Sequence, residues 1–287
     1  MRTGRMMVTI GVGVVFLSAT APAVGQEGQG AESRPVSRPW PPARMADGQP
    51  DVQGIWAAAP GGSVSLSNPI SGGADLERRI SGRELRVPSR IIDPPDGLVP
   101  YQPWAAALQK QQESVYDRPT RPEHIDPQHR CLLSGVPRLY TSVPPHRIIQ
   151  LPGAVLIIWD EYHAYRYIPL DNRPPVASYV KLWMGHSRGR WEGNTLVIDT
   201  TNIRGTRLSF TGDFLSDNAH LIERLTFVDA DTMNYEATIE DPTVFTRPWT
   251  MRVAHKRRPY EEAWESACME GNMPPDTWLL KDEPPRQ

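Results

Sequence analysis

Residues 148–172 read IIQLPGAVLIIWDEYHAYRYIPLDN and carry the pattern that decides the fold class. Two apolar runs, 148–151 and 154–162, flank a Pro-Gly pair, which is typical of a β-hairpin with a short turn. A third run over 164–170 ends at an Asp-Asn pair, and these residue types favour turns. We therefore expect three consecutive antiparallel strands here.

The rest of the second half continues this pattern. Further strands are expected over 179–184, 195–199, 220–228, 233–239 and 250–256. Short strands joined by polar turns, without helices between them, indicate an antiparallel sandwich or barrel rather than a βαβ fold. We favour a barrel, because the hairpins follow one another directly and closure removes exposed sheet edges.

The first half of the chain carries weaker signals. The stretch 51–56 (DVQGIW) enters a strand as in many up-and-down barrels, where the tryptophan closes the base. Residues 103–115 (PWAAALQKQQESV) form the best helix, with proline at its start. The expected fold is therefore mainly β: an antiparallel calycin- or lipocalin-like barrel with one short helix and long N-terminal loops.

The first 25 residues have the layout of a secretory signal peptide. Arg2 and Arg5 precede an apolar run over 6–20, and 21–25 (APAVG) offers small residues for cleavage. The apolar run is too short to span a bilayer, although a retained anchor is the alternative. We expect export to the periplasm or the medium, with no membrane association after cleavage.

After the signal peptide at 1–25, a leader over 26–45 is rich in Gly, Ser, Pro and Arg and is expected to be disordered or extended. Residues 46–287 then form a single β-rich domain. The formal charge of −2 argues against nucleic acid or anionic membrane as a partner.

The chain has two cysteines, Cys131 and Cys268. In an oxidising compartment, two thiols in one domain favour a disulfide. The alternative is two separately buried thiols.

Three carboxylates, Glu223, Glu161 and Asp241, lie on or continue the apolar face of a predicted strand. A buried carboxylate is costly without a partner, so each should pair with arginine or histidine or have a raised pKa. The functional interpretation is a site in the barrel mouth, with Glu223, His220 and Asp241 as acid–base catalysts. The structural interpretation is a set of ion pairs at strand ends.

Other polar and aromatic side chains on the same strands are expected to bind the substrate. They are Glu161, His163, Arg166, Arg224, Trp183, Trp191, Tyr235 and Trp249. The aromatic residues favour a small apolar or aromatic metabolite, although core packing is the alternative for most of them.

Other chemistries have less support. Glu161 and His163 lie two residues apart and could bind a metal, but no second pair of this quality accompanies them, so no cofactor is expected. The stretch 185–189 (GHSRG) has the spacing of a nucleophile elbow but no following helix, and we expect a β-turn. No phosphate-binding or dinucleotide glycine motif follows a strand into a helix.

Residues 183–200 read WMGHSRGRWEGNTLVIDT and resemble the W-G-x-S-x-G-x-W-E-G-D-T-L-V-V-D-T block of a large group of exported bacterial proteins. The likeness extends to 51–56, 131–138, 220–224, 240–242, 248–249 and 265–268. Asn194 stands where the block usually has aspartate. The resemblance implies export and a single domain, and it implies no particular reaction.

Two functions are consistent with these patterns. The first is an exported, cofactor-independent lyase, isomerase or hydrolase that acts on a small, largely apolar metabolite by acid–base chemistry. The alternative is a periplasmic small-molecule-binding protein without catalysis.

Overall fold

The computed structural model describes residues 42–62, 65–67, 89–116, 119–142, 144–262, 264 and 268. Internal contacts divide the chain between Val36 and Ser37, and all described residues belong to the second unit, Ser37–Gln287. The predicted signal peptide and most of the predicted leader lie outside the described residues.

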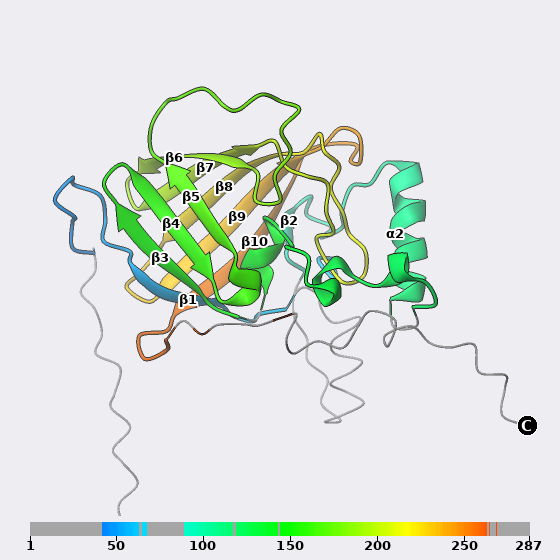
Figure 1. Cartoon of the computed structure of the whole chain (residues 1–287), viewed down its shortest axis with the longest axis horizontal. Helices are drawn as coiled ribbons and strands as arrows, with labels where there is room; N and C mark the ends of the chain where they lie inside the picture. The colour runs from blue at the N-terminus through cyan, green and yellow to red at the C-terminus, as the bar shows by residue number, and fades with distance from the viewer. Residues whose placement is uncertain are drawn as a thin grey trace, which may run out of the picture. The chain divides into compact units, whose positions relative to one another are not determined.

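The second unit is built on one antiparallel sheet (Figure 1). Its strands are β1 Gly54–Ala58, β2 Ile91–Asp93, β3 His146–Leu151, β4 Ala154–Trp159, β5 Tyr165–Pro169, β6 His186–Glu192, β7 Thr195–Thr201, β8 His220–Phe227, β9 Thr232–Glu240 and β10 Trp249–Arg257. Their order is β5-β4-β3-β1-β10-β9-β8-β7-β6, and β2 pairs with β10. The predicted mainly-β, antiparallel class is confirmed.

The sheet is nearly closed into a barrel. Its two end strands, β5 and β6, lie next to each other (Figure 1). Arg166 on β5 donates from Nε to Oγ of Ser187 on β6 at 2.9 Å. A Cβ at Gly189 of β6 would lie 2.8 Å from side-chain atoms of Ile168 and Leu170, so only glycine allows this approach. The closure confirms the predicted barrel and is compatible with a calycin-like fold.

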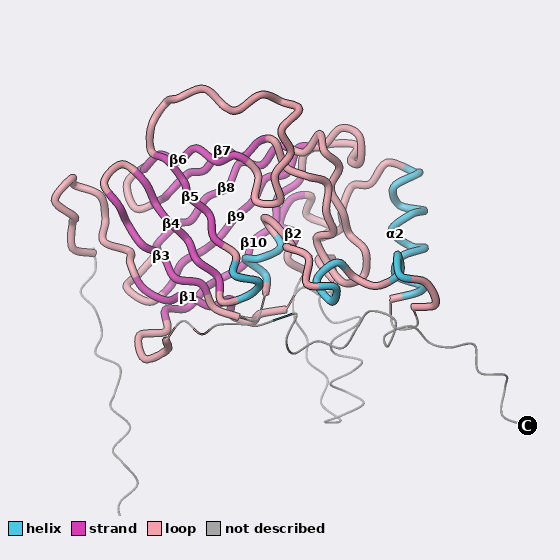
Figure 2. The backbone as a smooth tube through the Cα atoms, viewed as in Figure 1, coloured by secondary structure: helices cyan, strands magenta, loops and turns pink. Residues whose placement is uncertain are grey.

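The predicted helix is also confirmed. It is α2, Pro103–Val115, with proline in its first turn, and it stands beside the barrel (Figure 2). The short 3₁₀ helices are η1 Pro122–His124, η2 Pro127–Arg130, η3 Arg138–Thr141 and η4 Glu161–His163. Among the described residues, no helix has both the length and the apolar character needed to cross a membrane.

The predicted barrel-closing tryptophan, Trp56, is completely buried. Its ring meets Phe227 edge-on, with centroids 5.3 Å apart, and Arg257 places its guanidinium carbon 4.3 Å from the ring centroid. Its Nε1 donates to the carbonyl of Val52 at 3.1 Å. The indole therefore packs against both the strand start and the end of β10, which supports the predicted packing role.

The predictions around residues 179–189 were wrong. Residues 179–184 form no strand but part of the loop between β5 and β6, and 185–189 enter β6 rather than a turn. Asn202 holds the loop by donating to the carbonyls of Ala177 and Val180 at 2.8 and 2.9 Å. These tertiary hydrogen bonds replace the strand pairing that the local pattern suggested.

The face assignment beyond β4 was also wrong. Residues 154–162 were predicted as one strand, but β4 ends at Trp159 and η4 follows. Tyr162 has a left-handed backbone (φ 57°), which interrupts the alternation of faces. Tyr165 is consequently 67% exposed, whereas Arg166 is only 2% exposed. The phase of β5 is shifted by one residue, and Arg166 points into the barrel.

Candidate functional site

A buried ion pair lies inside the barrel. Arg166 donates from Nη1 and Nη2 to Oε1 and Oε2 of Glu223, at 2.9 and 2.5 Å. Tyr235 donates to the first carboxylate oxygen at 2.8 Å, and Thr200 donates to the second at 2.7 Å. Four donors therefore surround the carboxylate, and the expectation that Glu223 pairs with an arginine is confirmed.

This pair has a structural role. Every nitrogen of the Arg166 guanidinium has a partner, since Nε binds Ser187 and Nη2 also binds Thr200 at 2.6 Å. Burial lowers the pKa of Arg166, but the charge of Glu223 outweighs this and the pKa lies above its usual value. The group joins β5 to β6, β7, β8 and β9 across the junction of the barrel, and it leaves Glu223 without a free oxygen for a substrate.

The other two predicted catalytic residues have different surroundings. His220 lies on the opposite face of β8 from Glu223, between Asp199 and Glu240, with nitrogen–oxygen distances of 3.2 Å to each. Asp241 accepts from the backbone nitrogen and hydroxyl of Ser216 at 2.7 and 2.8 Å and holds the chain after β9. The structure does not bring Glu223, His220 and Asp241 together.

The predicted substrate-binding residues are equally dispersed. Arg224 pairs with Glu192 at 3.0 Å, and Trp191 donates to Gln49 at 2.7 Å. The guanidinium carbon of Arg204 lies 4.9 Å from the Trp183 ring centroid, and Trp249 packs edge-on against Phe245 at 5.4 Å. The side chain of His163 lies outside the described part of the chain. Of this set, Arg166 and Tyr235 alone contact Glu223 among the described residues.

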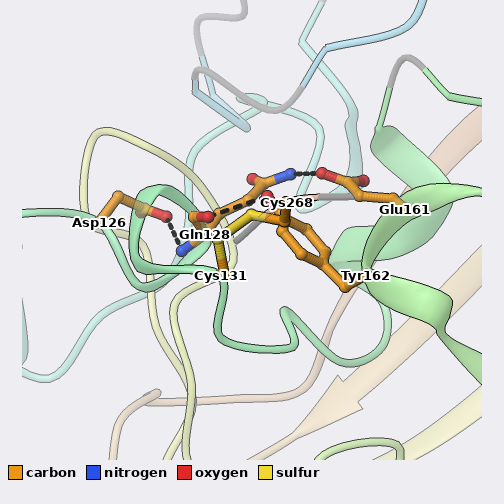
Figure 3. The surroundings of a disulfide bond; sticks show 6 residues. All are labelled: Asp126, Gln128, Cys131, Glu161, Tyr162 and Cys268. Carbon is orange, nitrogen blue, oxygen red and sulfur yellow. Dashed lines mark hydrogen bonds between the residues drawn. A yellow bond between two sulfur atoms is a disulfide. The ribbon is translucent and has the colours of Figure 1, made fainter. Parts of the chain in front are cut away.

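Glu161 belongs to a different group, beside the disulfide (Figure 3). Gln128 donates to its carboxylate, and the hydroxyl of Tyr162 donates to the Gln128 carbonyl at 2.9 Å. Cys131 and Cys268 are bonded next to this group, which confirms the predicted disulfide. Glu161 and His163 lie in η4 rather than on a strand face, so the alternation that suggested a shared metal site is absent.

A second polar group inside the barrel was not predicted. It consists of Tyr140 from η3, His146 from β3, Trp159 from β4 and His255 from β10, and we call it the interior polar cluster. The ring centroid of Tyr140 lies 5.4 Å from that of His146 and 5.3 Å from that of Trp159, and the centroids of the two histidine rings lie 5.2 Å apart. All four side chains are at most 2% exposed.

Each member of the cluster has a polar atom without a hydrogen-bond partner among the described residues. These atoms are the Tyr140 hydroxyl, His146 Nε2, Trp159 Nε1 and His255 Nε2. The Tyr140 hydroxyl lies near Arg166 but outside hydrogen-bond geometry. Each unsatisfied buried group costs about 1–3 kcal/mol, and such groups normally bind water or a ligand.

The two histidines are neutral at pH 7. Burial, followed by the charge of His255, lowers the pKa of His146 well below its usual value. Burial also lowers the pKa of His255 to about 4. Its Nδ1 lies 3.3 Å from the carbonyl of Val253, and hydrogen bonds to the carbonyls of Val253 and Tyr140 act on the ring. A proton on Nδ1 directed at Val253 leaves Nε2 as an acceptor.

The sequence contained a signal for part of this cluster. His255 lies on the same face as Trp249, Met251 and Val253. Because side chains alternate between the two faces of a strand, applying this rule to the predicted strand 250–256 would have placed His255 inside the barrel. His146 precedes the predicted strand 148–151 by two residues and shares the face of Ile148. Tyr140 lies in a predicted loop, and only its stacking on Tyr235, with centroids 3.8 Å apart, shows its position.

Within the described ranges, no three His, Cys, Asp or Glu side chains gather in an arrangement that could hold a metal ion. The interior polar cluster is therefore the candidate functional site. The resemblance of residues 183–200 to exported bacterial proteins stays a prediction. Comparisons with protein-family models, with curated proteins and with solved structures found no match for this chain.

Proposed function

We propose that this chain binds a small, largely apolar molecule inside the barrel through the interior polar cluster. The observation that carries the proposal is that four side chains with contacting rings, from four separate elements, each have a buried polar atom without a partner among the described residues. One such atom is common in a folded protein, but four on mutually contacting rings together favour a bound molecule.

The polarity of the cluster limits the ligand. Trp159 Nε1 can only donate, His255 Nε2 accepts in the neutral tautomer with its proton on Nδ1, and the Tyr140 hydroxyl does both. A hydroxyl group matches this combination, because it donates and accepts. The two histidines are neutral and Arg166 is paired with Glu223, so these three residues offer no net positive charge to an anion. The charge of Arg90 also acts on His255, and this guanidinium donates to the carbonyls of Pro60 and Gly62. Apolar neighbours such as Ile148 favour a hydrocarbon or aromatic skeleton.

A second candidate is acid–base catalysis on the same ligand, by a lyase, isomerase or hydrolase. It is favoured by the two neutral imidazoles, each of which can exchange a proton with a ligand, although their lowered pKa values make both weak bases at pH 7. His146 and His255 then take the role predicted for Glu223, His220 and Asp241. Export belongs to both candidates, because a disulfide is typical of oxidising compartments.

Fluorescence titration of the full chain with a monocyclic phenol and with a monoterpene alcohol tests the proposal. We expect a saturable change in tryptophan emission, since Trp159 lies in the cluster, and at least about tenfold weaker binding in His255→Phe. Arg224→Gln, on the outer face, is the control and should bind as the wild type does. Equal binding in His255→Phe, or no binding of either probe or of any co-purifying molecule, would falsify the proposal.

The same variants separate the two candidates. If the bound molecule is converted, His255→Gln should retain most of the binding but lose turnover. A wild-type protein that returns its ligand unchanged is a binding protein, and the catalytic candidate is then wrong.

A further inference from the structure

Two arginines face one carboxylate near η2, apart from the interior polar cluster. Arg138 forms a bidentate pair with Asp126, with distances of 3.0 and 3.1 Å, and both side chains are almost completely buried. Arg207 also faces Asp126, but its Nη1 lies 3.9 Å from Oδ2, beyond hydrogen-bond distance. The charge of Arg130 acts on Arg207 as well. Among the described residues, Arg138 takes both oxygens of this carboxylate, and neither Arg207 nor Arg130 has another ion pair.

Arg207 is poorly compensated. Its side chain is 14% exposed, and its Nη2 donates to the carbonyl of Glu123 at 3.1 Å. Burial lowers the pKa of Arg207, Asp126 raises it, and the charges of Arg138 and Arg130 lower it again. A cation that is both desolvated and repelled by its neighbours is stabilised by an anion.

Arg130 offers further donors. It is half-buried, and its Nε is buried without a hydrogen-bond partner in the described part of the chain. The Nε of Arg138 is also buried without a hydrogen-bond partner among the described residues. Among the described residues, Gln128 binds one carboxylate oxygen of Glu161, whose Oε2 has no hydrogen-bond partner, and the exposed side chain of Glu123 pairs with Arg121 at 3.4 Å.

The local backbone holds Arg130 in place. Asp126 caps η2 by accepting from the nitrogen of Gln128 at 2.9 Å, and Cys131 ends it with a left-handed backbone (φ 57°). The disulfide to Cys268 then fixes the residue that directly follows Arg130 (Figure 3). Because both ends of η2 are tied, little backbone entropy is lost when Arg130 binds a ligand.

Phe210 provides an apolar wall beside the charges. The guanidinium carbon of Arg138 lies 4.7 Å from its ring centroid, and the ring of His129 stacks on it at 5.0 Å. Phe210, His129, Arg130 and Arg207 are all partly exposed, so a small molecule can reach them. Guanidinium groups bind carboxylate and phosphate in the same planar, bidentate way.

We propose that Arg130 and Arg207, positioned by Arg138 and Asp126, bind the carboxylate or phosphate group of a small anionic molecule. This site is independent of the interior polar cluster, whose ligand is uncharged. The two sites share none of the residues that carry them.

The test measures binding of sodium phosphate and of sodium acetate to the full, disulfide-bonded chain by calorimetry, with sodium chloride at equal ionic strength as the reference. We expect phosphate to bind, and Arg130→Gln and Arg207→Gln each to bind it about tenfold more weakly. Arg204→Gln is the matched control, because it removes one exposed charge over Trp183, and it should bind as the wild type does.

The outcomes are distinct. Binding of acetate as well as phosphate supports the site and assigns it to carboxylates in general, whereas binding of phosphate alone supports it and assigns it to phosphoryl groups. Arg207→Lys, which keeps the charge but not the planar fork, should give intermediate affinity and guards against a folding defect in Arg207→Gln. The proposal is overturned if neither anion binds, or if Arg130→Gln and Arg207→Gln bind phosphate as tightly as Arg204→Gln.

Discussion

Among the described residues, two arginine–carboxylate pairs have both side chains buried, and they differ in what surrounds them. Arg166 and Glu223 lie inside the barrel, where every guanidinium nitrogen and both carboxylate oxygens have partners on neighbouring strands. Arg138 and Asp126 lie among loops and 3₁₀ helices, where the Nε of Arg138 has no partner among the described residues. The first pair is complete, whereas the second leaves donors and positive charge available.

Burial alone therefore does not show whether such a pair stabilises the fold or lies at a binding site. Both pairs are almost inaccessible to solvent, so exposure does not distinguish them. The number of hydrogen-bond partners distinguishes the two pairs, because a pair whose polar atoms are all hydrogen-bonded stabilises the fold and has no atom left for a ligand. Unpaired atoms nearby mark the places where a ligand can bind: the interior polar cluster on one side and the arginines around Asp126 on the other.

The largest expected change in stability comes from a variant that breaks the pair of Arg166 and Glu223. Glu223→Gln keeps the shape of the side chain but leaves Arg166 as an uncompensated buried charge, so the free energy of unfolding should fall by about 3–5 kcal/mol. Urea denaturation measures it. The control is Glu236→Gln, which removes the surface partner of Arg252 and should cost at most about 1 kcal/mol. Equal losses in the two variants would show that the interior pair is not special.

The histidines beside the complete pair should make stability depend on pH. The folded chain holds the pKa of His255 at about 4, below its ordinary 6.5. The unfolded chain therefore takes up a proton first as the pH falls, and the free energy of unfolding should decrease from pH 6.5 toward 4, by up to about 3 kcal/mol. In His255→Gln this dependence should be weaker. A pH profile that is the same in both proteins contradicts the assignment.

Breaking the pair of Arg138 and Asp126 should lower the free energy of unfolding by a smaller amount, and it should raise the affinity of the proposed anion site for phosphate. Asp126→Asn can still cap η2 but no longer neutralises Arg138, so we expect a loss of about 3 kcal/mol in stability, the lower end of the range for a broken buried pair. Phosphate should bind this variant more tightly than the wild type, because the anion then compensates three arginines. Calorimetry measures the affinity, and weaker phosphate binding in Asp126→Asn would refute the proposed balance of charges.

The smallest expected effect comes from a variant that leaves Arg166 Nε without a partner, as Arg138 Nε is among the described residues. Ser187→Ala removes the partner of Arg166 Nε and should lower the free energy of unfolding by about 1 kcal/mol. Ser114→Ala, in which the lost hydroxyl is exposed on α2, should change it by less than about 0.5 kcal/mol. If both variants are equally stable, the Ser187 contact across the barrel junction contributes nothing measurable.

Local patterns determined much of the fold from the sequence. Alternation of apolar and polar residues located the strands around residues 148–170, 195–199 and 220–256 and placed Glu223 on the inner face of β8. Helix propensity and an initial proline located α2 from 103 to 115. These features depend on neighbours a few residues apart, so the sequence alone contains them.

The tertiary structure alone decided which side chains meet. The turn at η4 shifts the phase of β5 and selects Arg166, rather than Tyr165, as the partner of Glu223. The pairing of β4, β3, β1 and β10 gathers Trp159, His146 and His255, and η3 adds Tyr140. Loop packing brings Arg207 to 3.9 Å from Asp126 at the start of η2. Such contacts join residues distant in sequence, and their geometry follows from strand register and loop packing. A local pattern carries neither.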